Sequence, residues 1–272
     1  MRVIFIKAII LALVEGITEF LPISSTGHMI LVDEFVALST DAAFTKVFLI
    51  VIQLPAILAV VCYFWKDLWP FHKAKEEQKR RFTLWFKIVL AFLPAAVFGL
   101  LLDDLIEAWL LYPVPVAIAL VVGGIILIIV ESAHLKTRFE NVHDLGWGTA
   151  FVIGLVQCLA MIPGTSRSAA TIIGARMLGA SRSAAAEFAF FLAKPTMMGA
   201  TAYTLLKIET RLNATQWAVI AVGSVVAFLT AWAVVAFLMN YIRRHDFRVF
   251  GYYRIVLGAI VLIYHYVLTS SV

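Results

Sequence analysis

Two acidic residues, Glu15 and Glu19, lie in an apolar stretch near the beginning of the chain. Because they are four residues apart, they share one face of a helix. Ionised carboxylates inside an apolar segment are energetically costly and usually mark a functional site. A pair on one face attracts either a divalent cation or a basic side chain. We therefore predict a functional acid pair, with a solvated helix end at a turn as the alternative.

Hydroxyl side chains and one histidine follow Pro22 in the segment 24–28. If a helix begins at Ser24, Ser25 and His28 lie three residues apart on one face, within hydrogen-bonding distance. A hydroxyl beside an imidazole is the arrangement that nucleophilic or acid–base chemistry needs. Serine and threonine after a proline are also ordinary helix caps, so capping is the alternative. With two carboxylates upstream, we favour the catalytic interpretation.

A second polar turn, 163–168, contains Arg167 among hydroxyl side chains. An arginine at membrane depth is expensive unless it meets an anion. Its planar fork suits phosphate oxygens, and the free amides at a helix start add to this attraction. The alternative is a salt bridge from Arg167 to Glu15 or Glu19, and the two roles are compatible. Carboxylates, an anion clamp and a nucleophile together indicate phosphoryl transfer.

Long apolar runs must position these residues, since 62% of the 272 residues are hydrophobic and only 14% are charged. Soluble domains carry about 25% charged residues. Such runs span or enter a bilayer as helices, which satisfy their own backbone groups. The net charge of +5 does not indicate nucleic acid, because the basic residues concentrate in short loops between apolar runs. A site between these helices implies a substrate with a lipid tail.

Two pairs of short apolar segments are too interrupted to be simple membrane spans. The segments 3–21 and 24–38 flank the first polar turn, and 147–162 and 168–180 flank the second. Broken helices of this kind usually enter the membrane and return, with the polar turn buried in protein. We predict two re-entrant helical hairpins whose turns meet near mid-depth.

The chain also contains a weak internal repeat, with copies at about 1–135 and 136–272. The similar stretches 13–17 and 155–159 are each followed by a proline-led polar turn. Each copy supplies one hairpin and three spans, which makes about six transmembrane helices in all. An odd number of spans turns the second copy upside down. We therefore predict a single all-α polytopic membrane domain, an inverted repeat of two five-helix halves.

The distribution of basic residues indicates how the chain is oriented. The loops 66–81, 132–146 and 240–249 hold half of the 22 Lys and Arg residues. Loops rich in Lys and Arg remain on the cytoplasmic side of a membrane. Both termini should then lie on the opposite, non-cytoplasmic side.

Two longer stretches carry a specific resemblance to a known family. They are EGITEFLPISSTGH at 15–28 and PGTSRSAAT at 163–171. Together with AAEF at 185–188 and PTMMGA at 195–200, they make the sequence similar to the undecaprenyl-pyrophosphate phosphatase family, also called the bacitracin-resistance family. The resemblance covers nearly the whole chain.

The resemblance implies removal of the terminal phosphate from undecaprenyl pyrophosphate, which yields the monophosphate carrier for peptidoglycan and other envelope glycans. It implies a divalent cation, Mg²⁺ or Ca²⁺, and a site in the bacterial cytoplasmic (inner) membrane that faces the periplasm. It also suggests bacitracin as a competitor for the substrate. A homodimer is left open, and no nucleic-acid partner is expected.

The family's functional residues match positions of this sequence one by one. Its acid pair, expected to hold the metal, matches Glu15 and Glu19. Its catalytic serine, histidine and arginine match Ser25, His28 and Arg167, and Glu19 is assigned to catalysis as well. Ser25 would attack the outer phosphorus while His28 helps to move the serine proton. The expected substrate-binding residues are Arg167 and four hydroxyl residues, Ser24, Thr26, Ser166 and Ser168.

Two alternatives stay open. A water activated by the cation or by a glutamate could attack directly, which would leave Ser25 to bind phosphate. Inverted repeats with broken helices are also typical of transporters, so a polyprenyl-phosphate transporter or flippase is the rival function. The sequence departs from the family at Lys194, where an aliphatic residue is expected. A lysine there would snorkel or pair with Glu187.

Overall fold

The computed structural model describes residues 2–71, 74–133, 135–207 and 212–269, without the side chains at positions 34, 103, 104 and 107. These residues form helices joined by short connections, and no strand occurs among them. The all-α prediction is confirmed. The elements are α1 (Arg2–Thr18), α2 (Ser25–Val36), α3 (Ala42–Val51), α4 (Gln53–Tyr63), α5 (Trp65–Leu68), α6 (Lys75–Leu110), α7 (Pro113–Ser132), η1 (Val142–Asp144), α8 (Trp147–Gln157), η2 (Cys158–Met161), α9 (Arg167–Met177), α10 (Arg182–Lys207), α11 (Ala214–Tyr241) and α12 (Arg248–Thr269).

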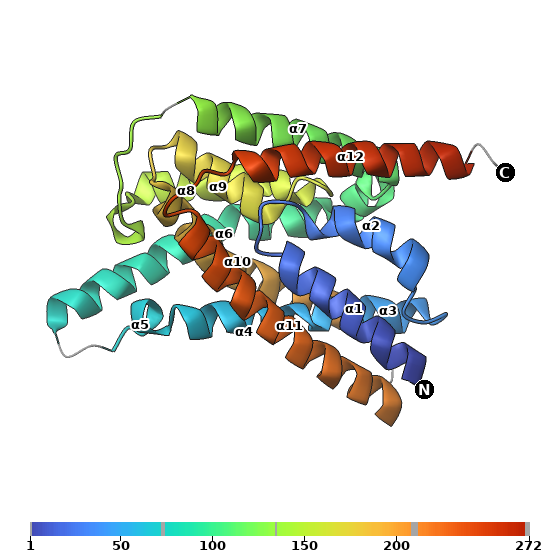
Figure 1. Ribbon diagram of the computed structural model, residues 1–272. Coiled ribbons are helices and arrows are strands. Elements are labelled where there is room, and N and C mark those ends of the chain that lie inside the picture. The colour runs from blue at the N-terminus through green and yellow to red at the C-terminus, as the bar shows by residue number, and fades with distance from the viewer. Residues whose placement is uncertain (1, 72–73, 134, 208–211, 270–272) are drawn as a thin grey trace.

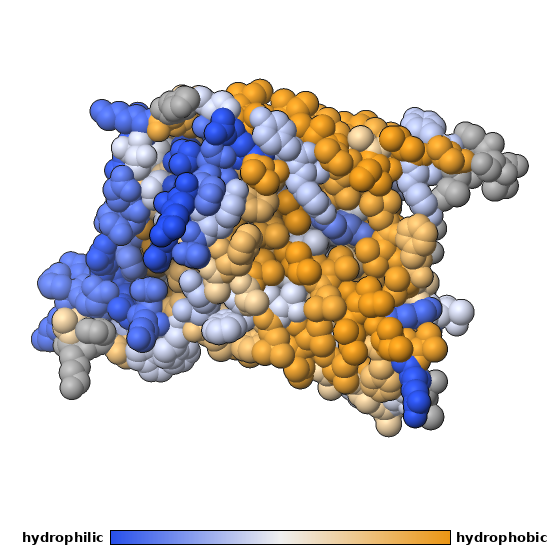
Figure 2. Space-filling model, in the orientation of Figure 1, coloured by the Kyte–Doolittle hydropathy of each residue, from blue (hydrophilic) through white to orange (hydrophobic). Residues whose placement is uncertain are grey.

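Five helical stretches in the described part of the chain are long and apolar enough to cross a membrane. They are Ala42–Tyr63, Lys75–Leu102, Pro113–Ser132, Ala214–Tyr241 and Arg248–Val267. Figure 2 shows a broad hydrophobic surface over the middle and right of the molecule and a hydrophilic end on its left. The protein is therefore a multi-pass α-helical membrane protein, as predicted.

One of the six spans predicted from the sequence, the apolar run 187–206, lies in α10 and is not among these five. Helix α10 has 26 residues, enough to cross a bilayer, but it includes Arg182, Glu187 and Lys194. Most of its first half is buried, and it packs against α4, α6 and α9. A helix in the interior of a bundle can carry polar residues because it presents little surface to lipid.

Lys194, the departure from the family pattern, lies inside this bundle. Its Nζ is buried and has no hydrogen-bond partner within the described structure. The amine lies 4.5 Å from the centre of the Phe191 ring and 5.6 Å from that of Trp85. Aromatic faces attract a cation through their quadrupole. These rings, and not Glu187, are therefore its neighbours, and the predicted pairing with Glu187 is wrong.

The contacts between the two halves of the chain occur in matched pairs. Helix α1 packs against α11, and α8 packs against α6. Similarly, α4 contacts α11 while α10 contacts α6, and α2 contacts α12 while α9 contacts α7. Helices α7 and α12 lie side by side along the top of Figure 1.

The basic loops and the chain ends lie at opposite ends of the bundle. In Figure 1 the connections α5–α6, α7–α8 and α11–α12 are toward the left, whereas α1 begins and α12 ends at the right. Residues 72–73 and 134, in two of these loops, residues 208–211, between α10 and α11, and residues 270–272, at the C-terminus, lie outside the described residues. The described chain thus separates its basic loops from its two ends along the bundle axis.

Candidate active site

The two polar turns end in the same backbone conformation. Ser24 precedes α2 with φ 72°, and Ser166 precedes α9 with φ 70°. Each serine hydroxyl accepts a hydrogen bond from the amide three residues on, at 3.5 Å from Gly27 N and 3.3 Å from Ala169 N. A positive φ is uncommon for a residue with a side chain and is often found at functional sites. Both serines are therefore helix caps, so the capping alternative holds for Ser24 but not for Ser25.

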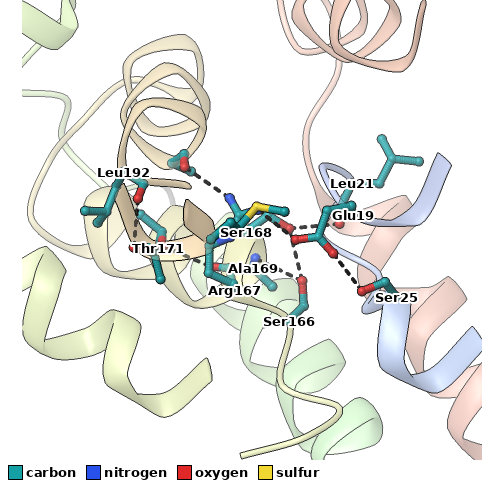
Figure 3. Close-up of polar contacts among 12 residues, drawn as sticks. Glu19, Leu21, Ser25, Ser166, Arg167, Ser168, Ala169, Thr171 and Leu192 are labelled. Atoms are coloured by element: carbon teal, nitrogen blue, oxygen red, sulfur yellow. Dashed lines mark hydrogen bonds and ion pairs between the residues drawn. The ribbon is translucent and has the colours of Figure 1, made fainter. Parts of the chain in front are cut away.

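Glu19 lies between the two turns and contacts both. Its Oε1 is 2.9 Å from Arg167 Nη2, and its Oε2 accepts a hydrogen bond of 2.7 Å from Ser25 Oγ (Figure 3). Ser25 and Arg167 are each the first residue of a helix, α2 and α9. The predicted salt bridge is confirmed for Glu19. The structure thus brings an acid, a hydroxyl and a guanidinium together from segments 148 residues apart.

Arg167 is held by groups on three sides. Nη1 donates to the Ala189 carbonyl at 3.3 Å, and Nη2 also lies 2.9 Å from Met197 Sδ. The guanidinium lies 5.8 Å from the centre of the Phe20 ring. Its Nε is buried and lacks a hydrogen-bond partner among the described residues. A buried unpaired donor is costly, and an anion bound beside it would remove that cost.

Glu15 is almost fully buried beside Glu19 and Gln53. Its Oε1 has no hydrogen-bond partner in the described part of the molecule. No group of three or more His, Cys, Asp or Glu side chains that could hold a metal occurs among the described residues. The adjacent carboxylates of Glu15 and Glu19 nevertheless carry oxygen donors of the kind that Mg²⁺ and Ca²⁺ prefer. The orphaned Glu15 oxygen fits a cation here, and the cation stays a prediction.

His28 does not pair with Ser25, so this prediction is wrong. Its Nδ1 is 2.7 Å from the Ser24 carbonyl oxygen, and its Nε2 is 2.7 Å from the Tyr253 hydroxyl of α12. The two rings are nearly parallel, at an angle of 10°. Both ring nitrogens are occupied, while the Ser25 hydroxyl is already bound to Glu19. Ser25, the first residue of α2, contacts Glu19 just after α1, whereas His28 contacts Tyr253 of α12.

The remaining predicted hydroxyl residues divide into two kinds. Ser168 is fully buried and donates to the Leu21 carbonyl at 2.8 Å, which joins the second turn to the first. Its oxygen is 3.0 Å from that of Ser166. Thr26 is only partly buried. Substrate binding by these hydroxyl groups therefore stays a prediction. In the structure, Ser166 and Ser168 contact each other, and Ser168 also contacts the first turn.

An apolar cavity of about 420 Å³ opens beside the Glu19–Arg167 pair. It is bounded mainly by α6, through Phe92, Ala96 and Gly99, and by α10, through Ala200 and Tyr203. Cavities that bind small molecules are mostly apolar with a few placed polar groups. One end of this cavity is lined by the charged Glu19 and Arg167 and the rest mainly by apolar residues, which suits an amphiphilic substrate.

We did not single out Gln53 and Tyr253 from the sequence. Gln53 lies at the start of α4 and Tyr253 near the start of α12, where a polar or aromatic residue is ordinary for a membrane helix. Their contacts with Glu15 and His28 cross 38 and 225 positions of sequence. The only signal for Gln53 was an amide in an otherwise apolar run.

Comparisons with known proteins show the family of the chain. The family model described as bacitracin resistance protein BacA matches residues 8–260. Undecaprenyl-diphosphatase 1 of Clostridioides difficile (strain 630) is 50% identical over 264 residues, which cover 96% of this chain and 96% of the relative. Undecaprenyl-diphosphatase of Enterococcus faecalis is also 50% identical, over 95% of this chain and 96% of the relative. With the family model spanning most of the sequence, the chain belongs to the bacitracin resistance protein BacA family.

Proposed function

We propose that the protein is an undecaprenyl-diphosphatase, a membrane hydrolase that removes the terminal phosphate of a polyprenyl diphosphate. The observation that carries this proposal is the carboxylate of Glu19, shared by Ser25 and Arg167 at the head of an apolar cavity. The relatives at 50% identity are named for the same activity. Such an enzyme recycles the lipid carrier for peptidoglycan synthesis.

The geometry supports Ser25 as the nucleophile and Glu19 as its base. Ser25 Oγ attacks the terminal phosphorus as its proton passes to Glu19, 2.7 Å away. The bond from that phosphorus to the bridging oxygen breaks, and the lipid monophosphate leaves. Glu19 passes this proton to the departing lipid monophosphate and is a carboxylate again. It then accepts a proton from the water that attacks the phosphoserine, and returns it to Ser25 Oγ as inorganic phosphate leaves. Arg167 binds the phosphate oxygens, whose negative charge a guanidinium fork stabilises in the transition state.

Direct attack by water is the alternative mechanism, since Glu19 could accept a proton from water as readily as from Ser25. In both mechanisms His28 acts at a distance, because its nitrogens are bonded to Ser24 and Tyr253. Its contribution is to hold the first turn. This replaces the earlier expectation that His28 moves the serine proton.

A divalent cation is part of the proposal. Glu15 and Glu19, with the Gln53 side chain beside them, would hold it. When bound, the cation would neutralise phosphate charge. Dialysis against a chelator, followed by thermal unfolding with added Mg²⁺ or Ca²⁺, tests the binding. A rise in unfolding temperature that Glu15→Gln abolishes supports this site.

We also propose how the helices are arranged and oriented in the membrane. The two halves form an inverted repeat, α1–α2 and α8–α9 are re-entrant hairpins, and α10 is the sixth crossing. The matched contacts between the halves support this. Because the basic loops belong to the cytoplasm, the termini lie in the periplasm. The cavity runs toward the later turns of α6 and α10, away from the basic end, so the site faces the periplasm of the inner membrane.

The test is phosphate release from detergent-purified protein supplied with a polyprenyl diphosphate. The parent should release one phosphate per lipid monophosphate formed, and Glu19→Gln should lose most of this turnover. A polyprenyl-phosphate transporter would move lipid without releasing phosphate, so an inactive parent that still transports lipid would contradict the proposal. Bacitracin should lower the rate by competing for the lipid, and the homodimer stays a prediction.

A further inference from the structure

Arg254, in α12, is fully buried behind the two polar turns. The structure records four hydrogen bonds from its guanidinium, all to backbone carbonyls. Two go to α7, from Nε to Leu120 O at 3.3 Å and from Nη2 to Ala119 O at 3.2 Å. The other two go to the turns, from Nη1 to Pro22 O at 3.4 Å and from Nη2 to Gly164 O at 3.2 Å.

The two turn carbonyls occupy the same place in their turns. Pro22 lies two residues before the cap Ser24, and Gly164 lies two residues before the cap Ser166. One planar guanidinium thus donates to equivalent atoms of both turns. Because its nitrogens are fixed relative to one another, it sets the separation of these carbonyls.

The neighbouring helix is shaped to admit this side chain. A Cβ at Gly123 of α7 would lie 2.2 Å from Arg254 Nη2 and 2.9 Å from its Cζ. Gly164 has φ +95°, and a Cβ there would lie 2.3 Å from the Val116 carbonyl oxygen of α7. The second turn therefore rests directly on α7, and the arginine fills the space that Gly123 leaves.

A buried charge needs a reason beyond filling space. A buried cation is costly unless its donors are satisfied, and an apolar residue of similar volume often stabilises a fold better. Here the satisfied donors reach both turns that carry the Glu19 contacts, and Arg254 is not among the residues that line the cavity. Ser25 lies three residues after Pro22, and Arg167 lies three residues after Gly164, the two turn residues whose carbonyls Arg254 binds.

We propose that Arg254 is a positioning residue, which fixes the two polar turns relative to each other and so aligns Ser25 and Arg167 on Glu19. This role rests on the proposed phosphatase activity. Arg254 touches no reacting atom. Moving it should misalign the nucleophile and the phosphate-binding group together.

Two variants test this role. Arg254→Lys changes the arginine itself, and Gly123→Ala changes the residue of α7 that makes room for it. Lysine keeps the charge but offers one point of donation, and the alanine methyl displaces the guanidinium. Gly258→Ala is the matched control, because its Cβ would crowd Val121 and the Ala117 carbonyl in the same α7–α12 interface without meeting Arg254. We measure the folded fraction by thermal unfolding, and kcat and KM for phosphate release per folded molecule.

Both test variants should lower kcat per folded molecule by roughly 10²-fold, as a misplacement of about 1 Å can, with a smaller change in KM. Gly258→Ala should lower the unfolding temperature but retain its kcat. A folded Arg254→Lys protein within threefold of the parent kcat would overturn the inference, as would an equal kcat loss in Gly258→Ala. An inactive parent would instead contradict the proposed function, on which this role depends.

Discussion

The first polar turn and the second have the same backbone but opposite chemistry. Ser24 and Ser166 cap their helices at φ 72° and 70° with the same hydroxyl contact. The next residue is Ser25 in one turn and Arg167 in the other, and both side chains meet Glu19. The comparison teaches that one helix-start geometry was used twice, to aim a nucleophile and an anion-binding group at a shared carboxylate.

The two acids of the site, Glu15 and Glu19, both lie in the first half of the chain. Glu15 in α1 corresponds to Gln157 in α8 in the repeat alignment. Gln157 donates to Thr196 and accepts from Thr171, at 3.2 and 3.4 Å, so its amide stays within a neutral network. One half therefore provides negative charge and the other provides Arg167. At the site the two halves of the chain are therefore complementary in charge.

The largest expected effect is that of Ser25→Ala, which removes the nucleophile from the first turn. Turnover should fall on the order of 10³-fold or more, as for other nucleophile deletions, while cation-dependent binding of substrate persists. Phosphate release measures turnover, and Ser132→Ala, at the basic end of α7, is the control. Turnover within tenfold of the parent would exclude the serine mechanism and favour direct attack by water.

Arg167→Lys tests the corresponding position of the second turn. Lysine keeps the positive charge but loses the fork that binds Glu19 and phosphate together. We expect a loss on the order of 10²-fold, close to that of Arg167→Ala. Arg80→Lys, in an exposed pair with Asp144, should leave the rate of phosphate release unchanged. If Arg167→Lys had near-normal turnover, only its charge would matter.

A smaller effect is expected where the first turn contacts α12. His28→Ala and Tyr253→Phe both remove the hydrogen bond between these side chains. One hydrogen bond contributes about 0.5–1.5 kcal/mol, so each rate should fall roughly 2- to 12-fold. Direct proton transfer by His28 would give a loss of about 10²–10⁴-fold. A loss of that size in His28→Ala alone, with Tyr253→Phe unaffected, would restore the catalytic assignment of the histidine.

The smallest effects are expected at the two helix caps, Ser24 and Ser166, and are measured as changes in the free energy of unfolding. Ser24→Ala and Ser166→Ala lose the capping oxygen and keep a strained φ, so each should reduce the free energy of unfolding by about 1–2 kcal/mol. The glycine variants relieve that strain and should cost only a few tenths of a kcal/mol. Thermal unfolding measures both series. Unequal losses at the two serines would show that the turns differ in more than their chemistry.

Much of this protein could be predicted from its sequence alone. The apolar composition predicts a helical membrane protein, because no other arrangement satisfies the backbone in lipid without closing a barrel. The proline-led breaks predict where α1 and α8 end, and polar residues at these breaks mark the site. The Glu19–Arg167 ion pair was among the stated alternatives. All of these depend on local residue type and spacing.

The partners across the bundle were decided only by the tertiary structure. Ser25 bonds to Glu19 and not to His28, since the rotation of α2 relative to α1 sets which face meets which neighbour. The charged residues of α10 are accommodated because other helices surround it. In the sequence, Arg254 is an ordinary basic residue near the start of a helix, and nothing there indicates its role. Its reach to Pro22, across 232 positions, exists only because α12 packs behind both turns.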